Sequence, residues 1–267
     1  MNTFQLQAVL RPITLAAALA ASAAAAAAVG PAGAINTNGS MENIGYGAGG
    51  NIFQLQPMLF VQGLGNANDP LSIATLNPLL QYSFVVTDAG TALMKINYSI
   101  SNSSATESFS QLRFMLFANA DGDSVNFLDR VSETWGAAAT GDPERREARE
   151  FIDPSTTLLS SFQVNGNLTE GTTACLTGAG CDATLGLQWN APLLGPQQTW
   201  LVSIGLSDNG QHLSSRFLDV NAVNTPDTIL TLSGVASISA VPLPWSALLF
   251  GSGLMALGAG ARRRGKK

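Results

Sequence analysis

The sequence has little of the chemistry that hydrolytic catalysis most often uses. Its 267 residues include one histidine, His212, and two cysteines, Cys175 and Cys181. A Ser-His-Asp or Cys-His scheme needs a histidine beside the nucleophile, but His212 lies in the polar segment SDNGQHLSS. Neither Ser207 nor Ser214 of that segment occurs in a nucleophile-elbow motif. We therefore expect no catalytic residues and no enzymatic activity.

Positive charge is also scarce in the central part of the chain. Of the 13 basic residues, Arg11 lies near the start and five follow residue 261, whereas all 18 acidic residues lie between Glu42 and Asp227. The segment between carries seven basic and eighteen acidic residues, a net charge of −11. Such a charge favours solubility and attraction of cations, and it gives no electrostatic footprint for nucleic acid.

The N-terminus is typical of a secretory signal peptide. The polar stretch MNTFQLQAVLR is followed by the apolar run PITLAAALAASAAAAAAV and then by GPAGA. Ala32 and Ala34 place small side chains at the two positions that a signal peptidase recognises, so we predict a signal peptide over residues 1–34, cleaved after Ala34. Cleavage within the alanine run, near Ala28, is the main alternative. Retention as an N-terminal helix is a third, since alanine is a strong helix former.

Export determines how the two cysteines are interpreted. Cys175 and Cys181 occur in the segment CLTGAGC. In an oxidising compartment one such pair is expected to close a small disulfide loop. A metal pair is the alternative, but the chain has one histidine and no second cysteine pair to complete such a site.

Residues 35–51 are rich in glycine and asparagine, and we expect a flexible arm there, before a domain at 52–240. This segment contains Gly45-x-Gly47-x-x-Gly50, formally a dinucleotide fingerprint. That motif requires a strand before it and a helix after it. A predicted cleavage site precedes it and the strand-like NIFQLQPMLFVQ follows, so we exclude nucleotide binding.

Period-two patterns dominate the domain. In LMKINYSIS, apolar Met94, Ile96, Tyr98 and Ile100 alternate with polar residues, and residues 79–101 together predict a β-hairpin. FSQLRFMLFANAD is apolar on both faces apart from Arg113, as expected of a central strand. Further strands are predicted in four segments: ATLGLQWN, TWLVSIGLS, RFLDVNA and TILTLSGVASIS.

One segment favours a helix. GDPERREAREFI places Asp142 at an N-cap and Pro143 at the first helical position, ahead of good helix formers. We expect a short surface helix there, inside a long excursion over residues 121–157. Many strands with one such helix predict an all-β fold: a single antiparallel β-sandwich of jelly-roll or immunoglobulin-like type.

The best candidate for a metal site is NADGDSVNFLD. Its oxygen-bearing residues Asn119, Asp121 and Asp123 alternate as in the first half of a calcium-binding EF-hand loop. Glycine falls at the fourth position instead of the sixth, and Arg130 stands where the bidentate glutamate belongs. A calcium site recruiting Asp129 is therefore one interpretation, and a turn with solvated carboxylates is the other.

The C-terminus predicts a membrane segment. The apolar run Trp245–Ala261 is 17 residues long, about 25 Å of helix, and extension back to Val241 reaches the length that spans a bilayer. Five basic residues follow within 262–267. Because basic flanks stay in the cytoplasm, the β domain is expected outside the inner membrane.

VPLPWSALLFGSGLMALGAGARRR resembles the PEP-CTERM sorting signal in its VPLPA-type variant. The resemblance covers residues 241–267, about a tenth of the chain. It depends on a Pro motif at 241–244, the GSGL at 251–254 within a transmembrane helix at 245–261, and an arginine cluster. The matching motif residues are Val241, Pro242, Leu243, Pro244, Arg262, Arg263 and Arg264. Trp245 departs from the variant, which usually has alanine there, and this puts efficient processing in question.

The resemblance implies a Gram-negative bacterial protein that an exosortase, a membrane enzyme, cuts near the Pro motif. Proteins of this family are typically associated with exopolysaccharide and biofilm matrix. The β domain also resembles domains that often precede this signal, whose role is unassigned. We therefore expect a structural or interaction protein that is anchored briefly in the inner membrane and then deployed at the cell surface or outside it. The alternative is a calcium-dependent carbohydrate-binding module.

Overall fold

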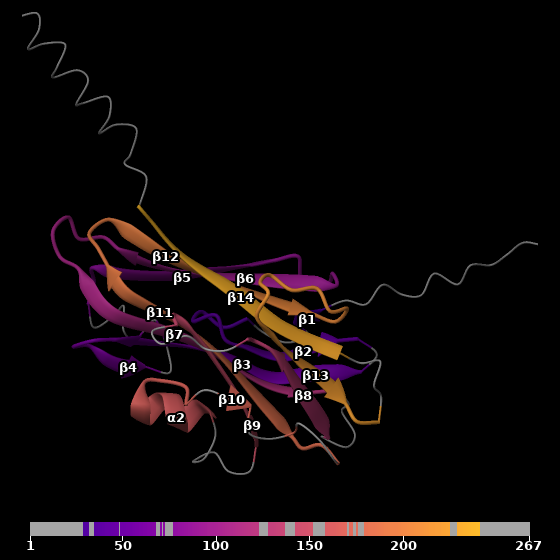
Figure 1. The fold of residues 1–267 in the computed structure, drawn as a ribbon. Coiled ribbons are helices and arrows are strands. Elements are labelled where there is room, and N and C mark those ends of the chain that lie inside the picture. The colour runs from indigo at the N-terminus through magenta and orange to yellow at the C-terminus, as the bar shows by residue number, and fades with distance from the viewer. Residues whose placement is uncertain are drawn as a thin grey trace, which may run out of the picture.

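The protein is an all-β sandwich of two sheets packed face to face (Figure 1). A computed structural model describes residues 29–31, 35–47, 49–67, 70, 72, 77–122, 128–136, 142–151, 158–169, 171–172, 175, 179–224 and 229–240. Among these residues every strand pair is antiparallel except one short pair at a sheet edge, β10 with β9. The predicted fold class is confirmed at this level.

The larger sheet has eight strands in the order β1-β2-β3-β7-β11-β9-β10, with β4 paired to β3. Their bounds are β1 Gly30–Pro31, β2 Met41–Tyr46, β3 Gly50–Val61, β4 Gly65–Ala67, β7 Phe109–Asp121, β9 Glu144–Glu150, β10 Gly171–Thr172 and β11 Ala183–Leu194. The strand β7, which the sequence predicts to be central, lies between β3 and β11 and pairs with both along most of its length.

The smaller sheet has six strands in the order β5-β6-β12-β14-β13-β8. Their bounds are β5 Leu80–Thr87, β6 Leu93–Asn102, β8 Asp129–Thr134, β12 Gln198–Ser207, β13 Phe217–Ala222 and β14 Ile229–Ala240. The predicted hairpin is confirmed, because β5 and β6 pair from Leu80 opposite Asn102 to Thr87 opposite Lys95.

The main core lies between the two sheets and is built by alternation along each strand. On β6 the apolar residues that alternate from Met94 to Ile100 are all fully buried, as the sequence predicts. Trp189 of β11 and Trp200 of β12 come from opposite sheets, and both are buried in this core. Burying such large side chains removes much apolar surface from water, which is the main force holding the layers together.

A second, smaller apolar cluster lies on the outer face of the eight-stranded sheet. The helix α2 (Leu158–Asn165) covers this face (Figure 1). The cluster comprises Met58, Met115, Phe117, Leu158, Phe162 and Leu168. Because the helix covers this face, β7 is apolar on both sides. No helix among the described residues has the length and apolar character to cross a membrane.

The predicted position of the surface helix is wrong. Glu144–Glu150 forms β9, which pairs antiparallel with β11 from Glu144 opposite Trp189 to Glu150 opposite Ala183. Arginine and glutamate favour a helix in isolation, but a strand here completes the hydrogen bonds of β11 and buries Ala148. Asp142 still makes the expected local contact, since its Oδ1 accepts from the N–H of Glu144 at 3.0 Å.

The flexible arm predicted for residues 35–51 is also wrong. Met41–Tyr46 forms β2, which pairs with β3 and buries Met41, Ile44 and Tyr46. The preceding turn is held against the core, because the hydroxyl of Tyr98 donates to the carbonyl oxygen of Gly39 at 3.1 Å. The sandwich therefore begins well before residue 52.

The chain before this segment also enters the sheet. Val29 is fully buried, its N–H donates to the oxygen of Thr91 at 2.7 Å, and its own oxygen accepts from Gly90 at 2.8 Å. The two residues of β1 then pair with Ile44 and Gly45 of β2. Ala32 and Ala34, the predicted cleavage positions, lie outside the described residues.

Candidate functional site

The residues predicted to bind calcium lie at one end of the sandwich. Asn119 and Asp121 occupy alternate positions at the end of β7, and Asp129 begins β8. A hydrogen bond links the two sheets here: the N–H of Gly122, directly after β7, donates to Oδ1 of Asp129 at 2.7 Å. Asp123, the fourth predicted ligand, lies outside the described residues.

Two of these carboxylates are buried, and their charges act on a buried tyrosine. Asp121 and Asp129 are 1% and 0% exposed, and the hydroxyl of Tyr46 donates to the backbone oxygen of Asp121 at 2.6 Å. The pKa of Tyr46 is raised well above its ordinary value, first by burial and then by the charges of Asp129 and Asp121. Both buried carboxylates therefore lie near enough to Tyr46 for their charges to act on its hydroxyl.

This cluster does not by itself make a metal centre. No group of three or more His, Cys, Asp or Glu side chains in the described part of the chain is arranged to hold a metal ion. Asn119 is half-buried and contributes an amide oxygen on the strand that carries Asp121. Calcium binding through Asn119, Asp121, Asp123 and Asp129 stays a prediction.

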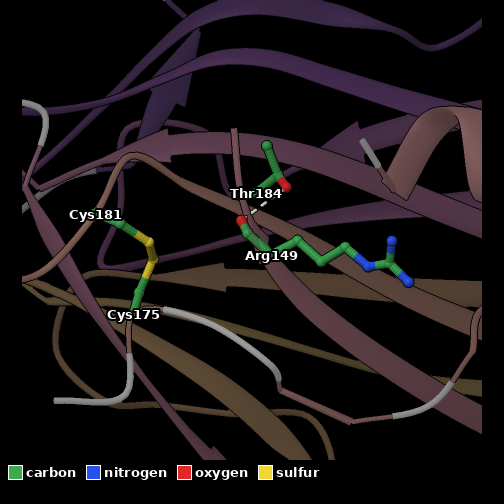
Figure 2. The surroundings of a disulfide bond; sticks show 4 residues. All are labelled: Arg149, Cys175, Cys181 and Thr184. Carbon is green, nitrogen blue, oxygen red and sulfur yellow. Dashed lines mark hydrogen bonds between the residues drawn. A yellow bond between two sulfur atoms is a disulfide. The ribbon is translucent and has the colours of Figure 1, made fainter. Parts of the chain in front are cut away.

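The disulfide lies beside this end of the sandwich and is confirmed. Cys175 and Cys181 are bonded, with their Cα atoms 5.2 Å apart. Figure 2 shows the bond near the start of β11, where Thr184 donates to the backbone oxygen of Arg149 at 3.0 Å. Both cysteines also contact β8: Val131 donates to the oxygen of Cys175, and Asp129 exchanges two hydrogen bonds with Cys181. The loop therefore ties the edge of the smaller sheet to the larger one.

His212 lies in a surface turn. Its ring stacks on Phe217, with centroids 4.6 Å apart. The hydroxyl of Ser207 is hydrogen-bonded to Asn209, and that of Ser214 donates to the backbone oxygen of Arg216. His212, Ser207 and Ser214 thus each contact a different residue: Phe217, Asn209 and Arg216, respectively.

A cleft that the sequence did not predict lies on the outer face of the eight-stranded sheet, beside the end of α2. It encloses about 430 Å³, which is within the range of small-ligand sites. We call it the arginine cleft. Its polar lining comprises Gln111, Arg113, Asp142, Arg145, Asn167 and Asn190.

Strand register brings these residues together. Arg113 of β7 lies opposite Asn190 of β11, and Gln188 of β11 lies opposite Arg145 of β9. Residues 113, 188 and 190 share the outer face because side chains alternate along a strand. Asn167 comes from the loop after α2, which also receives hydrogen bonds from both arginines: Arg113 donates to Gly166 and Arg145 to Leu168.

A buried glutamine organises the amides of the cleft. Gln188 is fully buried, and its Oε1 accepts from the N–H of Leu168 at 2.7 Å. Its Nε2 donates to Oδ1 of Asn167 at 2.8 Å and to Oδ1 of Asn190 at 2.6 Å. The side-chain oxygens of both asparagines therefore accept from Gln188, which leaves the Nδ2 group of each asparagine as a donor.

The cleft carries excess positive charge. The pKa of Arg113 is lowered, first by burial and then by the neighbouring charge of Arg145. Arg113 lies over the ring of Phe60, 4.6 Å from its centroid. Neither Arg113 nor Arg145 has a carboxylate within salt-bridge distance among the described residues, whereas Asp142 at the rim is paired with Arg216 at 2.7 Å.

One feature of the sequence pointed toward the cleft. Arg113 is the single basic residue of β7, directly before the apolar run from Phe114 to Ala118, and a buried or half-buried arginine there requires a polar neighbour. The residues of the sorting motif, Val241 to Pro244 and Arg262 to Arg264, lie outside the described residues. No family model, no curated protein and no solved structure matches the chain.

Proposed function

We propose that this is an exported protein of structural or interaction type that a PEP-CTERM-like tail directs to the cell surface or extracellular matrix. The observation that supports it most is the pairing of β14, the last strand among the described residues. β14 pairs with β12 as far as Ala240 opposite Gln198, where β12 begins, and the Pro motif follows at Val241. The pairing of these two strands therefore needs no residue of the tail, as a removable tail requires.

The proposed route has four parts. A signal peptidase removes the N-terminal segment, and a transmembrane helix at 245–261 holds the chain in the inner membrane with the sandwich outside. An exosortase-like enzyme then cuts near residues 241–244, and the domain is released or attached at the surface, where exopolysaccharide is its expected surrounding. The net charge of −11 between the two ends suits a solvated domain outside the cell. The finer assignment of the sandwich to the jelly-roll or immunoglobulin-like type is part of the same proposal.

We place the signal cleavage near Ala28 instead of after Ala34. Cleavage after Ala34 would remove β1 and the buried side chain of Val29, with its two hydrogen bonds to the β5–β6 turn. Cleavage after Ala28 leaves that strand in place, and Ala26 and Ala28 supply the small residues that the peptidase requires.

Intact-mass measurement of the mature protein tests both ends at once. The chain is expressed in a Gram-negative host with and without an exosortase, and the surface and medium fractions are compared. We expect a mature N-terminus at Val29 and loss of the tail only where the enzyme is present. A chain that keeps all residues through Lys267 in the presence of the enzyme overturns the sorting proposal.

Calcium-dependent carbohydrate binding is the second candidate. It is favoured by the burial of Asp121 and Asp129 at the end of the sandwich that carries Tyr46, since a bound cation offsets the cost of burying carboxylates. Thermal unfolding with calcium and with EDTA, followed by a glycan array under both conditions, tests it. An unchanged melting temperature and calcium-independent glycan signals would exclude this candidate.

A further inference from the structure

Four of the six polar residues that line the arginine cleft can donate hydrogen bonds to a ligand: Arg113, Arg145, Asn167 and Asn190. Asn167 and Asn190 each present an Nδ2 group, because Gln188 engages both of their oxygens. Arg113 and Arg145 each have five N–H donors, of which one Nη1 group on each is used on the loop after α2. A site that presents donors from four side chains is complementary to a ligand with several acceptor oxygens.

The two arginines do more than secure the loop after α2. One donor from each suffices for the contacts with Gly166 and Leu168. The Nε of Arg145 is buried and has no hydrogen-bond partner within the described part of the chain. An unsatisfied buried donor costs free energy, and a second guanidinium nearby adds repulsion. A bound anion would offset the repulsion between the two guanidinium groups.

The apolar residues that line the cleft indicate the character of the uncharged part of the ligand. Pro143 and Pro192 are exposed and provide apolar wall beside the donors, whereas Leu112 and Ala191 border the cleft but are buried in the core between the sheets. Asp142, the carboxylate among the lining residues, is held by Arg216 at the rim, where it disfavours a second negative charge on the ligand. A compact ligand with one charged end and a less polar body fits this division.

We propose that the arginine cleft binds an organic carboxylate whose body is about the size of one sugar ring, as in a uronic acid. The carboxylate accepts from Arg113 and Arg145, and the Nδ2 groups of Asn167 and Asn190 donate to its oxygens or to adjacent hydroxyls. Charge-assisted bonds to arginine supply the strongest part of this recognition. The inference holds whether or not the chain is exported or its tail is cut.

Titration calorimetry of the full chain tests this, in a polyoxyethylene detergent that contains no sugar. Sodium glucuronate is compared with glucose, which lacks the carboxylate, and with acetate, which lacks the ring. We expect glucuronate to bind at least tenfold more tightly than either one. Equal binding of acetate overturns the sugar-sized body, equal binding of glucose overturns the carboxylate, and absence of glucuronate binding up to millimolar concentrations overturns the site.

Asn190→Asp is the most specific variant. Its remaining Oδ1 still accepts from Gln188, so the fold is kept, but the donor facing the cleft becomes a negatively charged acceptor. Asn97→Asp is the matched control on the other sheet, where Oδ1 of Asn97 accepts from Ser203 at 2.7 Å. We expect N190D to weaken glucuronate binding at least tenfold and N97D to leave it unchanged.

Arg145→Gln provides an independent check if N190D alters the melting temperature. It keeps a donor for the loop and removes the charge, and it is expected to weaken binding by a similar factor. Arg130→Gln, at an exposed position of β8 on the other sheet, removes the same charge from a residue that does not line the cleft. Equal losses in R145Q and R130Q, or in N190D and N97D, would show that only net charge matters and would overturn the proposed site.

Discussion

Gly234 of β14 lies directly against the indole of Trp189 of β11, across the interface between the two sheets. A Cβ atom on Gly234 would stand 2.5 Å from Cζ2 of Trp189 and 2.8 Å from the carbonyl oxygen of Ser203. Real Cβ atoms do not approach other atoms this closely, so the separation of the sheets here depends on the missing side chain. The largest buried side chain of β11 thus occupies the space that Gly234 leaves.

Gly234→Ala is expected to lower the free energy of unfolding by about 1–3 kcal/mol, the usual cost of overpacking a core. Neither neighbour can yield easily, because one is a buried ring and the other is backbone. Gly45→Ala is the matched control, since no atom lies within 4 Å of a Cβ there. Denaturant unfolding of both variants measures the difference. Equal stabilities of G234A and G45A would contradict the packing argument.

Tyr46→Phe is expected to lower the free energy of unfolding by about 1–3 kcal/mol, because it leaves the backbone oxygen of Asp121 without its 2.6 Å hydrogen bond. The ring itself keeps its packing in the core. Denaturant unfolding and hydrogen exchange at the ends of β2 and β7 provide the measurement. If Y46F is as stable as the unmodified chain, the buried contact at this end of the sandwich contributes nothing.

The strands that the sequence predicts are those whose signal is local. On β6 the alternation from Met94 to Ile100 is complete within one segment, and the structure buries each of these residues. β9 shows the opposite case, because its helix-favouring composition competes with pairing to β11, about forty residues further along the chain. β2 was missed because Asn43 and Gly45, in a segment rich in both residue types, obscure the three buried positions at Met41, Ile44 and Tyr46.

The arginine cleft could not be predicted from local sequence patterns of this kind. Arg113 is conspicuous in the sequence, but its partners come from β9, from β11 and from the loop after α2. Their meeting depends on the register of three strands, and a shift of one residue would turn Gln188 and Asn190 to the other face. By contrast, the spacing of Cys175 and Cys181, together with the expected oxidising compartment, suggested their bond without a structure.

Reduction of the Cys175–Cys181 bond is expected to lower the free energy of unfolding by about 2 kcal/mol, the value for a loop this short. The loop links β8 to the start of β11, so its loss frees an edge of the smaller sheet. Unfolding with and without dithiothreitol measures the effect. The double variant Cys175→Ser, Cys181→Ser is the control, and its stability should not depend on the reductant. A reductant effect of the same size in that variant would assign the loss to another cause.

Asp182→Asn is expected to stabilise the protein at neutral pH by about 0.5 kcal/mol, a small value because the group is partly solvated. Burial, and then the charge of Glu150, raise the pKa of Asp182 above its ordinary 3.8. The ionised carboxylate is therefore less favourable in the folded state than in the unfolded chain, and the cost is complete above the folded pKa. As the pH falls through that pKa the folded state takes up the proton, and below about 3.8 the cost vanishes.

The difference in unfolding free energy between D182N and the unmodified chain should therefore be largest at pH 7 and decline toward zero near pH 4. Denaturant unfolding across this range measures it. Asp88→Asn is the control, since Asp88 is exposed and its Oδ2 accepts from Lys95 at 3.0 Å. That variant should show no gain at pH 7, because the carboxylate it removes has a cation beside it and water around it. A pH-independent gain in D182N would show that packing, and not the buried charge, separates the two chains.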